Sequence, residues 1–301
     1  MRYRHFLEID DLSAAELSLV LDHAEHLHPP AVLAGAGMAL LFDKPSARTR
    51  HSTEMAVVQL GGHPAYIQGS EVGLDVRESV EDVTRTLACY YKAIGARVFD
   101  HLTVERMAAL DVVPIVNLLS DRAHPLQALA DLLTMRAALG SLQGRTVAYV
   151  GDANNVCRSL ALGAQMCGMH VRVGHPPGYG FDAVDLDRLR ALGSEPFMTT
   201  DAIEAVAGAA VVYTDVWTSM GQEAETQARR DAFARYRVTN ALLDRAEQGA
   251  VFLHCLPAHR GEEVTDEVVD GPRSLVWAQA ANRMHAARGL LVWLLQAAEA
   301  R

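Results

Sequence analysis

The apolar residues of this chain fall into short runs separated by longer segments with a helical period. In the first half, apolar runs at residues 38–42, 94–98 and 112–116 predict strands, and residues 50–60 carry the pattern of a helix. Strands that alternate with helices in this way predict βα units and a parallel sheet.

The same alternation begins again after residue 139, where Gly140 and Gly144 interrupt the helical pattern. A helix over residues 125–139 is expected to link the two halves, and residues 282–298 predict a closing helix. Four further strands are expected in the second half, at residues 146–150, 170–173, 210–214 and 251–254.

The pattern therefore predicts an α/β fold of two doubly wound parallel-sheet domains joined by a linking helix. The expected domains are residues 1–138 and 139–281, with the C-terminal helix, residues 282–301, packing back on the first domain. A length of 301 residues, 50% of them hydrophobic and 21% charged, is enough for two cores of this kind.

Charge and composition exclude several classes of partner. A net charge of −10 and a pI near 5.7 argue against nucleic acid or an anionic membrane surface, because both require a basic field. An anionic substrate would need a local cluster of arginines. No apolar run reaches the roughly 18 residues of a membrane span, and the first residues lack an apolar signal, so a cytoplasmic location is expected.

The cysteines and histidines do not predict a metal site. Four cysteines lack the C-x-x-C spacing of zinc and redox sites, so reduced thiols are expected. Thirteen histidines are present without an H-E-x-x-H motif or a comparable close pair.

Polar side chains follow the first predicted strand in the segment FDKPSARTR, residues 42–50. A helix start offers unpaired N–H groups and a positive dipole end. Ser46 and Thr49 add hydroxyl groups, and Arg48 can hold two phosphate oxygens. The segment predicts a cradle for an oxyanion or phosphate; the alternative is a serine N-cap with solvated arginines.

His124 and Gln127 lie at the start of the linking helix, where Pro125 suits the first turn. Three positions apart, both side chains can face one point in front of the helix. One can donate to a carbonyl oxygen and the other accept from an amide N–H, which suits a carbamoyl group. The alternative is a histidine that caps the helix or lies on the surface.

The turn at residues 151–155, GDANN, occupies the place of a dinucleotide-binding fingerprint but lacks its glycines, so a nicotinamide cofactor is not expected. Asn154 and Asn155 can bind the carboxylate of a zwitterion through their amide groups. The alternative is an Asx turn, which asparagine favours in any case.

Three more segments carry candidate chemistry. Asp215 can hold an ammonium group, or it can cap a turn. Cys255 beside His254 suggests a thiol nucleophile, but neighbours in a strand point to opposite faces, so the pair is not expected to hydrogen-bond. Arg283 is expected to open the C-terminal helix, as an anion ligand or as a surface charge.

Taken together, the motifs S-A-R-T-R, H-P-L-Q, D-V-W-T-S-M-G, H-C-L-P and N-R-M-H resemble, in this order and spacing, those of the ornithine carbamoyltransferases. The resemblance covers nearly the whole chain and extends, through the first two motifs, to the aspartate carbamoyltransferases. It implies transfer of the carbamoyl group of carbamoyl phosphate to the side-chain amine of L-ornithine, giving citrulline and phosphate in arginine metabolism. It also implies a homotrimer or a multiple of trimers, with no metal and no organic cofactor.

The resemblance further implies a carbamoyl phosphate-binding first domain and an ornithine-binding second domain. The residues it assigns to carbamoyl phosphate are Ser46, Ala47, Arg48, Thr49, Arg97, His124, Gln127, Cys255, Leu256 and Arg283. Among these it assigns catalytic roles to Arg97, His124, Gln127, Cys255 and Arg283. For ornithine it implies Asn155, Asp215, Ser219 and Met220.

The chain departs from this family at several positions. Ala47 replaces a usual hydroxyl residue, and Gly73 and Asp75 replace a glutamine and a small residue, followed by Arg77 where a lysine is common. Residues 71–79 are the loop that the resemblance implies reaches a neighbouring subunit. The alternatives are a relative that carbamoylates another amine, such as aspartate, putrescine or an acylated ornithine, and a non-catalytic paralogue. A nicotinamide oxidoreductase is a third and weaker alternative.

Overall fold

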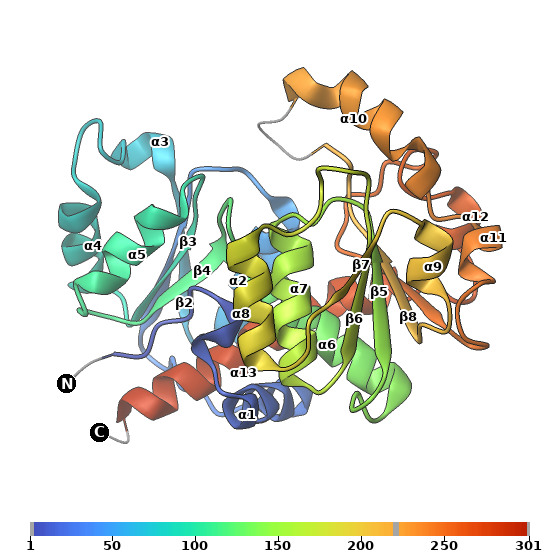
Figure 1. Ribbon diagram of the computed structural model, residues 1–301. Helices are drawn as coiled ribbons and strands as arrows, with labels where there is room; N and C mark the ends of the chain where they lie inside the picture. The colour runs from blue at the N-terminus through green and yellow to red at the C-terminus, as the bar shows by residue number, and fades with distance from the viewer. Residues whose placement is uncertain (1–2, 219–222, 300–301) are drawn as a thin grey trace. The chain divides into compact units, whose positions relative to one another are not determined.

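The computed structural model describes residues 3–218 and 223–299, and the chain divides into two compact units (Figure 1). Unit 1 comprises Met1–Leu133 with Ala281–Arg301, and unit 2 comprises Thr134–Ala280. Each unit holds one parallel sheet with helices, which confirms the predicted fold class. The predicted ligand-binding domains, with limits at residues 138 and 281, stay a prediction.

Unit 1 contains the first half of the alternating pattern. Its elements are η1 (Ile9–Asp11), α1 (Ala14–Glu25), β1 (Gly37–Phe42), α2 (Ala47–Gln59), β2 (His63–Gln68), α3 (Gly69–Val72), α4 (Val80–Ala88), β3 (Ala93–Arg97), α5 (His101–Ala109), β4 (Ile115–Leu119) and the start of α6 (Pro125–Leu139). The C-terminal helix α13 (Val276–Glu299) begins in unit 2 and returns its later turns to unit 1.

Unit 2 repeats the alternation. Its remaining elements are β5 (Thr146–Val150), α7 (Asn155–Met166), β6 (His170–Gly174), α8 (Ala183–Leu192), β7 (Phe197–Thr199), α9 (Ala202–Val206), β8 (Val211–Thr214), η2 (Glu223–Glu225), α10 (Thr226–Phe233), η3 (Ala234–Tyr236), α11 (Asn240–Leu243), β9 (Val251–His254) and α12 (Asp266–Val269).

The sheet of unit 1 has the strand order β2-β1-β3-β4. Successive residues of a strand face opposite sides, and both Leu40 and Leu41 of β1 are fully buried, so the sheet is covered on both faces. On the face of Leu41, Val83 and Leu87 of α4 and Met107 of α5 complete one apolar cluster.

The sheet of unit 2 has the order β7-β6-β5-β8-β9 and is also covered on both faces. Val212 of β8 and Phe252 of β9 belong to a cluster that Phe233 of α10 completes. Tyr149 and Tyr213, on β5 and β8, stack with ring centroids 5.5 Å apart.

The N-terminal segment covers the free edge of β4. Phe6 forms a parallel bridge to Val116, with its N–H donating to the carbonyl of Ile115 at 2.8 Å and its carbonyl accepting from Asn117 N at 2.8 Å. An exposed strand edge would present unpaired backbone groups, so this segment satisfies the edge of the sheet.

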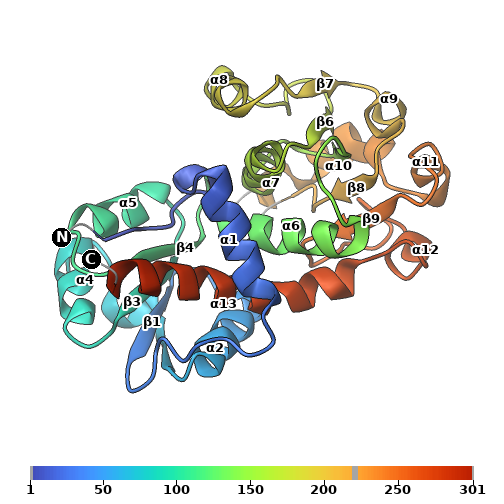
Figure 2. The same cartoon turned by 90° about the horizontal axis from the view of Figure 1, so that it is seen from below.

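The helices α1 and α13 pack closely in unit 1, and both views show them side by side (Figures 1 and 2). A Cβ atom at Gly289 would lie 2.5 Å from the carbonyl oxygen of Val20 and 2.6 Å from the nitrogen of Ala24. Next to it, Arg288 Nη2 donates to the carbonyl of Ala24 at 2.8 Å. Glycine at position 289 therefore permits the contact.

Most predicted elements are confirmed, several with shifted boundaries, and the largest shifts are in α2, which starts at Ala47 rather than residue 50, in β4 and in α13. Residues 146–150 and 251–254 form β5 and β9 with the predicted bounds. β4 starts at Ile115 rather than residue 112, and α13 starts at Val276 rather than residue 282. Pro114 precedes β4 directly and has no N–H to give to a strand ladder, which accounts for the later start.

In the part of the chain that the structure describes, no helix has both the length and the hydropathy needed to cross a bilayer.

We expect Gly289→Ala to destabilise the protein. Alanine normally gains about 1 kcal/mol over glycine inside a helix, but the new methyl group would overlap backbone atoms of α1, and overpacking costs about 1–3 kcal/mol. A lower free energy of unfolding in urea would verify this. The control is Ala281→Ser on an exposed position of α13, with an effect within about 0.5 kcal/mol. A more stable Gly289→Ala protein would contradict the close packing.

Candidate active site

The candidate residues of unit 1 follow the carboxyl ends of strands at a topological switch point. The chain passes from β1 outward to β2 and then crosses back to β3 on the other side of β1. Open α/β sheets bind ligands where the strand order reverses in this way. Ser46 and Thr49 follow β1, Arg97 ends β3, and His124 comes shortly after β4.

Ser46 is the N-cap of α2, which was the alternative to a phosphate cradle in the sequence analysis. Its hydroxyl oxygen accepts from the N–H of Thr49 at 3.3 Å, and its hydroxyl lies 3.2 Å from Thr49 Oγ1. Ala47 is the first residue of α2, and the side chain of Arg48 in the first turn is exposed. A helix start with an exposed arginine at its first turn still provides the elements of an anion site.

The hydroxyl of Thr49 is the centre of a buried polar cluster. Arg283 Nη2 donates to Thr49 Oγ1 at 2.7 Å, and Arg97 Nη1 donates to the same atom at 3.3 Å. Arg283 also donates to the amide oxygen of Gln127, whose nitrogen donates to Asp131 Oδ1 at 2.7 Å. Predicted residues of β3 and α13 therefore meet at Thr49 of α2, and Gln127 of α6 joins them through Arg283.

The position of Arg283 corrects one expectation. Because α13 begins at Val276, Arg283 does not open the helix but lies well inside it. Its side chain is buried rather than a surface charge.

His124 is buried in the same unit. Burial lowers its pKa well below the ordinary value of 6.5, and the nearby positive charges of Arg283 and Arg97 lower it further. Its backbone carbonyl accepts from Gln127 N at 3.0 Å, so the residue stands at the head of α6. The imidazole is therefore neutral near pH 7 and has one N–H to donate.

The switch point of unit 2 lies between β5 and β8. After β5, Asn154 caps α7 through Oδ1, which accepts from Val156 N and Cys157 N, both at 3.0 Å. Its Nδ2 donates to Asp215 Oδ2 at 3.0 Å, in the loop after β8. The asparagine turn expected as an alternative is thus present, and the same side chain also orients Asp215.

Asp215 has a second partner in this unit. Cys255, after β9, directs its Sγ to Asp215 Oδ1 at 2.9 Å. Asn154 was predicted, with Asn155, to bind the carboxylate of a zwitterion; in the structure its amide nitrogen donates to the carboxylate of Asp215. Asn155 is the first residue of α7 and half-buried.

The segment after β9 is held by His254. Its Nδ1 accepts from the N–H of Leu256 at 2.9 Å, so the ring proton is on Nε2, which faces Glu263 Oε1 at 3.1 Å. Leu256 has φ of 58°, a left-handed backbone that leucine rarely adopts. His254 and Cys255 thus turn to different partners.

Asp215, His254 and Cys255 each place one possible ligand atom within 4.8 Å of the others. A metal ion there would require His254 to give up the hydrogen bond to Leu256 or to Glu263. The donor set is therefore already used by protein contacts, and the absence of a metal site stays a prediction.

In the loop at residues 71–79, two of the residues that depart from the family pattern, Gly73 and Asp75, have a left-handed backbone. Gly73 ends α3 with φ of 62°, and Asp75 has φ of 54°. Asp75 pairs with Arg106 of α5 at 2.5 Å, and Arg106 also pairs with Glu81 at 2.7 Å. Arg77 is exposed on this loop. Predicted residues Ser219 and Met220 lie outside the described residues.

Two family models match the chain in consecutive segments. Residues 4–137 match the aspartate/ornithine carbamoyltransferase carbamoyl-P binding domain, and residues 143–294 match the Asp/Orn binding domain of the same family. The chain belongs to the aspartate/ornithine carbamoyltransferase family. The resemblance of its motifs is thereby confirmed.

Similar proteins cover the chain almost completely. The ornithine carbamoyltransferase of Thermus thermophilus is 49% identical over 297 residues, which is 97% of each chain. The solved structure of ornithine carbamoyltransferase from Pyrococcus furiosus has a TM-score of 0.91 and 42% identity and covers 96% of both chains. The structure of the Thermus thermophilus enzyme has a TM-score of 0.89.

In this carbamoyltransferase, some of the predicted residues are in contact with one another within each unit. In unit 1, Thr49 joins Arg97 and Arg283, and Arg283 joins Gln127. In unit 2, Asp215 joins Cys255 directly. The roles of these residues stay predictions.

We expect the stability of this carbamoyltransferase to fall as the pH falls. The pKa of His124 is lower in the folded chain than its ordinary value of 6.5, so the unfolded chain binds this proton more readily. The stability that neutral His124 contributes is fully present above about pH 6.5. It is lost as the pH falls from there toward the lowered pKa of His124 in the folded chain. Urea unfolding at several pH values should show a smaller loss in His124→Gln, which cannot titrate. Equal losses in both proteins would contradict the assignment.

Proposed function

We propose that this carbamoyltransferase moves the carbamoyl group of carbamoyl phosphate to the side-chain amine of L-ornithine, giving L-citrulline and phosphate. The observation that carries the proposal is the cluster around Thr49. In a chain with a net charge of −10, it buries two arginines beside the start of a helix. Such a concentration of cationic donors suits a doubly charged phosphate.

Carbamoyl phosphate is the ligand proposed for unit 1. Its phosphate would bind at the start of α2, to Ser46, Thr49, the backbone of Ala47 and the exposed Arg48, with Arg97 at the end of β3. The hydroxyls of Ser46 and Thr49 lie 3.2 Å apart, close enough to reach neighbouring oxygens of one phosphate.

The carbamoyl group is the part that reacts. Attack by the amine forms a C–N bond and puts negative charge on the carbonyl oxygen; the C–O bond to phosphate then breaks and the amine loses a proton. Donors already in place at that oxygen lower the barrier. His124, neutral because its pKa is lowered, and Arg97 are proposed for this task, with Gln127 and Arg283 binding beside them.

L-ornithine is the ligand proposed for unit 2. The two neutral donors at Asp215, from Asn154 and Cys255, leave its negative charge available for an α-ammonium group. Asn155, Ser219 and Met220 complete the proposed amino-acid site, and Cys255 and the carbonyl of Leu256 are proposed to contact the carbamoyl group. Since only the neutral side-chain amine has a lone pair, the rate should rise with pH.

We also propose a cytoplasmic homotrimer, or a multiple of trimers, that acts in arginine metabolism. The relatives at 42–49% identity are ornithine carbamoyltransferases, which supports the substrate. The loop with Gly73 and Arg77 is proposed to reach a neighbouring subunit, and the Asp75–Arg106 pair would hold it in shape.

A citrulline assay on the purified protein tests the function. With carbamoyl phosphate present, we expect turnover with ornithine and little with putrescine or aspartate. Asp215→Asn removes the charge that holds the ammonium and should raise the KM for ornithine about 10- to 100-fold, which corresponds to about 1.5–3 kcal/mol.

Asp187→Asn is the matched control, because Asp187 is 76% exposed in α8 and pairs only at the surface with Arg190. It should leave the KM for ornithine unchanged. Turnover with aspartate or putrescine in preference to ornithine would refute the proposed substrate, and ligand binding without turnover would favour a non-catalytic paralogue.

We expect Arg48→Ala to weaken the use of carbamoyl phosphate about 10- to 100-fold, because a charged hydrogen bond to phosphate is worth about 1.5–3 kcal/mol. The saturation curve for carbamoyl phosphate measures this. Arg50→Ala is the control, since Arg50 already pairs with Glu54 at 2.8 Å and stacks on Tyr66. An unchanged curve for Arg48→Ala would remove Arg48 from the phosphate site.

A further inference from the structure

A short turn in unit 1 leads directly into His124. Residues 120–123 follow β4, and the N–H of Ser120 donates to the carbonyl of Ala123 at 2.9 Å. The N–H of Ala123 donates back to Ser120 Oγ at 3.2 Å. His124 is the next residue and lies directly before α6. This hydrogen-bonded turn therefore fixes the backbone position from which the imidazole of His124 extends.

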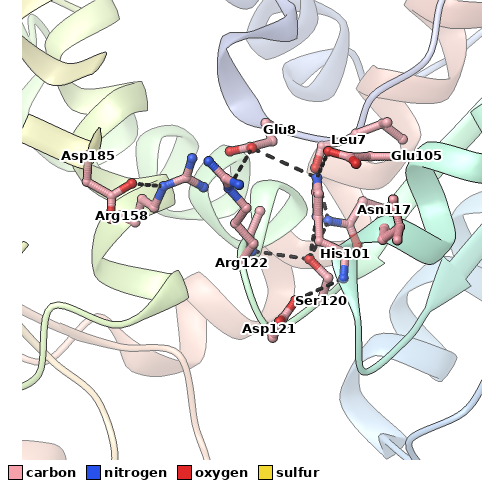
Figure 3. Close-up of polar contacts among 12 residues, drawn as sticks. Leu7, Glu8, His101, Glu105, Asn117, Ser120, Asp121, Arg122, Arg158 and Asp185 are labelled. Carbon is pink, nitrogen blue, oxygen red and sulfur yellow. Dashed lines mark hydrogen bonds and ion pairs between the residues drawn. The ribbon is translucent and has the colours of Figure 1, made fainter. Parts of the chain in front are cut away.

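The hydroxyl of Ser120 joins this turn to two other elements (Figure 3). Asn117 Nδ2, on β4, donates to Ser120 Oγ at 3.2 Å, and His101 Nδ1, at the start of α5, lies 2.7 Å from the same atom. Ser120 and Asn117 are fully buried, and His101 is nearly so. A buried hydroxyl with this many partners has little freedom to rotate.

The contacts of Ser120 Oγ indicate the direction of these bonds. A serine hydroxyl has two acceptor sites and one proton. The N–H groups of Asn117 and Ala123 donate to Ser120 Oγ, and we assign His101 Nδ1, 2.7 Å away, as the acceptor of the Ser120 proton. The imidazole of His101 then carries its own proton on Nε2, toward Glu8 at 3.9 Å and Glu105 at 3.7 Å.

His101 is itself held in place from two sides. Its backbone N–H donates to Asp121 Oδ1 at 2.9 Å, which ties α5 to the same turn. Glu8, which faces its ring, belongs to the N-terminal segment on the edge of β4 and lies 3.6 Å from Arg122 Nε. The carbonyl of Leu7, in that segment, accepts from Asn117 Nδ2 at 2.9 Å.

We propose that Ser120, held by His101 and Asn117, is a positioning residue that sets His124 for the reaction. The inference rests on the proposed function, in which His124 donates to the carbonyl oxygen. None of the three side chains needs to touch the substrate. Displacement of a catalytic group by about 1 Å costs on the order of 100-fold in rate, so the hydroxyl of Ser120 matters through the place it gives to His124.

The first test removes the hydroxyl. Ser120→Ala should lower kcat about 10- to 100-fold, while the KM for ornithine stays within about twofold, because the loss falls on a contact that strengthens in the transition state. Ser120→Thr keeps the hydroxyl and should retain most of the rate. A fall of the same size in both variants would overturn the role of the hydroxyl.

The second test removes the acceptor. His101→Leu takes away the atom that receives the Ser120 proton, whereas His101→Asn places an amide oxygen near the position of Nδ1. We expect kcat to fall with leucine and to be largely kept with asparagine. Full activity of His101→Leu would overturn the proposal.

Thr84→Val is the matched control. Thr84 is also fully buried, and its hydroxyl donates to the carbonyl of Val80 in its own helix at 2.7 Å. Its kcat per folded enzyme should equal that of the unmodified protein. If Thr84→Val lost as much rate as Ser120→Ala, general destabilisation would explain both and the positioning role would be overturned.

Imidazole NMR separates this proposal from the proposed function. The His124 ring signals, assigned by their absence in His124→Gln, should shift in Ser120→Ala and stay in place in Thr84→Val. Unmoved signals in Ser120→Ala overturn the positioning role. If the unmodified protein makes no citrulline, the proposed function fails, and the NMR result still decides whether Ser120 positions His124.

Discussion

A guanidinium has five N–H groups and a charge that it cannot lose, so burying one is costly unless oxygens surround it. In unit 1 the two terminal nitrogens of Arg283 find oxygens on Thr49 and Gln127, which lie 234 and 156 residues away in the chain. The C-terminal helix must therefore return to unit 1 before α2 and α6 have their buried partner. Burial keeps His124 neutral by lowering its pKa, and the charges of Arg283 and Arg97 lower that pKa further.

In unit 2 the charged group held in place is a carboxylate, and its hydrogen-bond partners carry no charge. Asp215 receives an amide and a thiol, both uncharged, and the amide belongs to the residue that also caps α7. One asparagine thus links helix formation to the orientation of a charged group. His254 performs a comparable task for the left-handed Leu256, with Glu263 fixing its ring.

Much of this arrangement follows from the sequence. The strands that precede the motifs are continuous apolar runs, so β1, β3, β5, β8 and β9 could be located along with the loops behind them. β2 was missed because most of its residues, HPAYIQ, are only partly buried, and β7 because it has three residues. Without both, the strand orders and the two switch points could not be derived.

Long-range side-chain contacts were the other feature that could not be predicted from the sequence. That Arg283 reaches Thr49 from 234 residues away, or that Asn154 reaches Asp215 from 61 residues away, depends on tertiary packing that no local pattern encodes. The N-terminal segment is a third case, since Asn117 holds Leu7 across 110 residues. Closing so large a loop is entropically slow, so this contact should form late in folding, after the nearby βα units. Docking of the segment around Leu7 onto the edge of β4 would then be among the last events in folding.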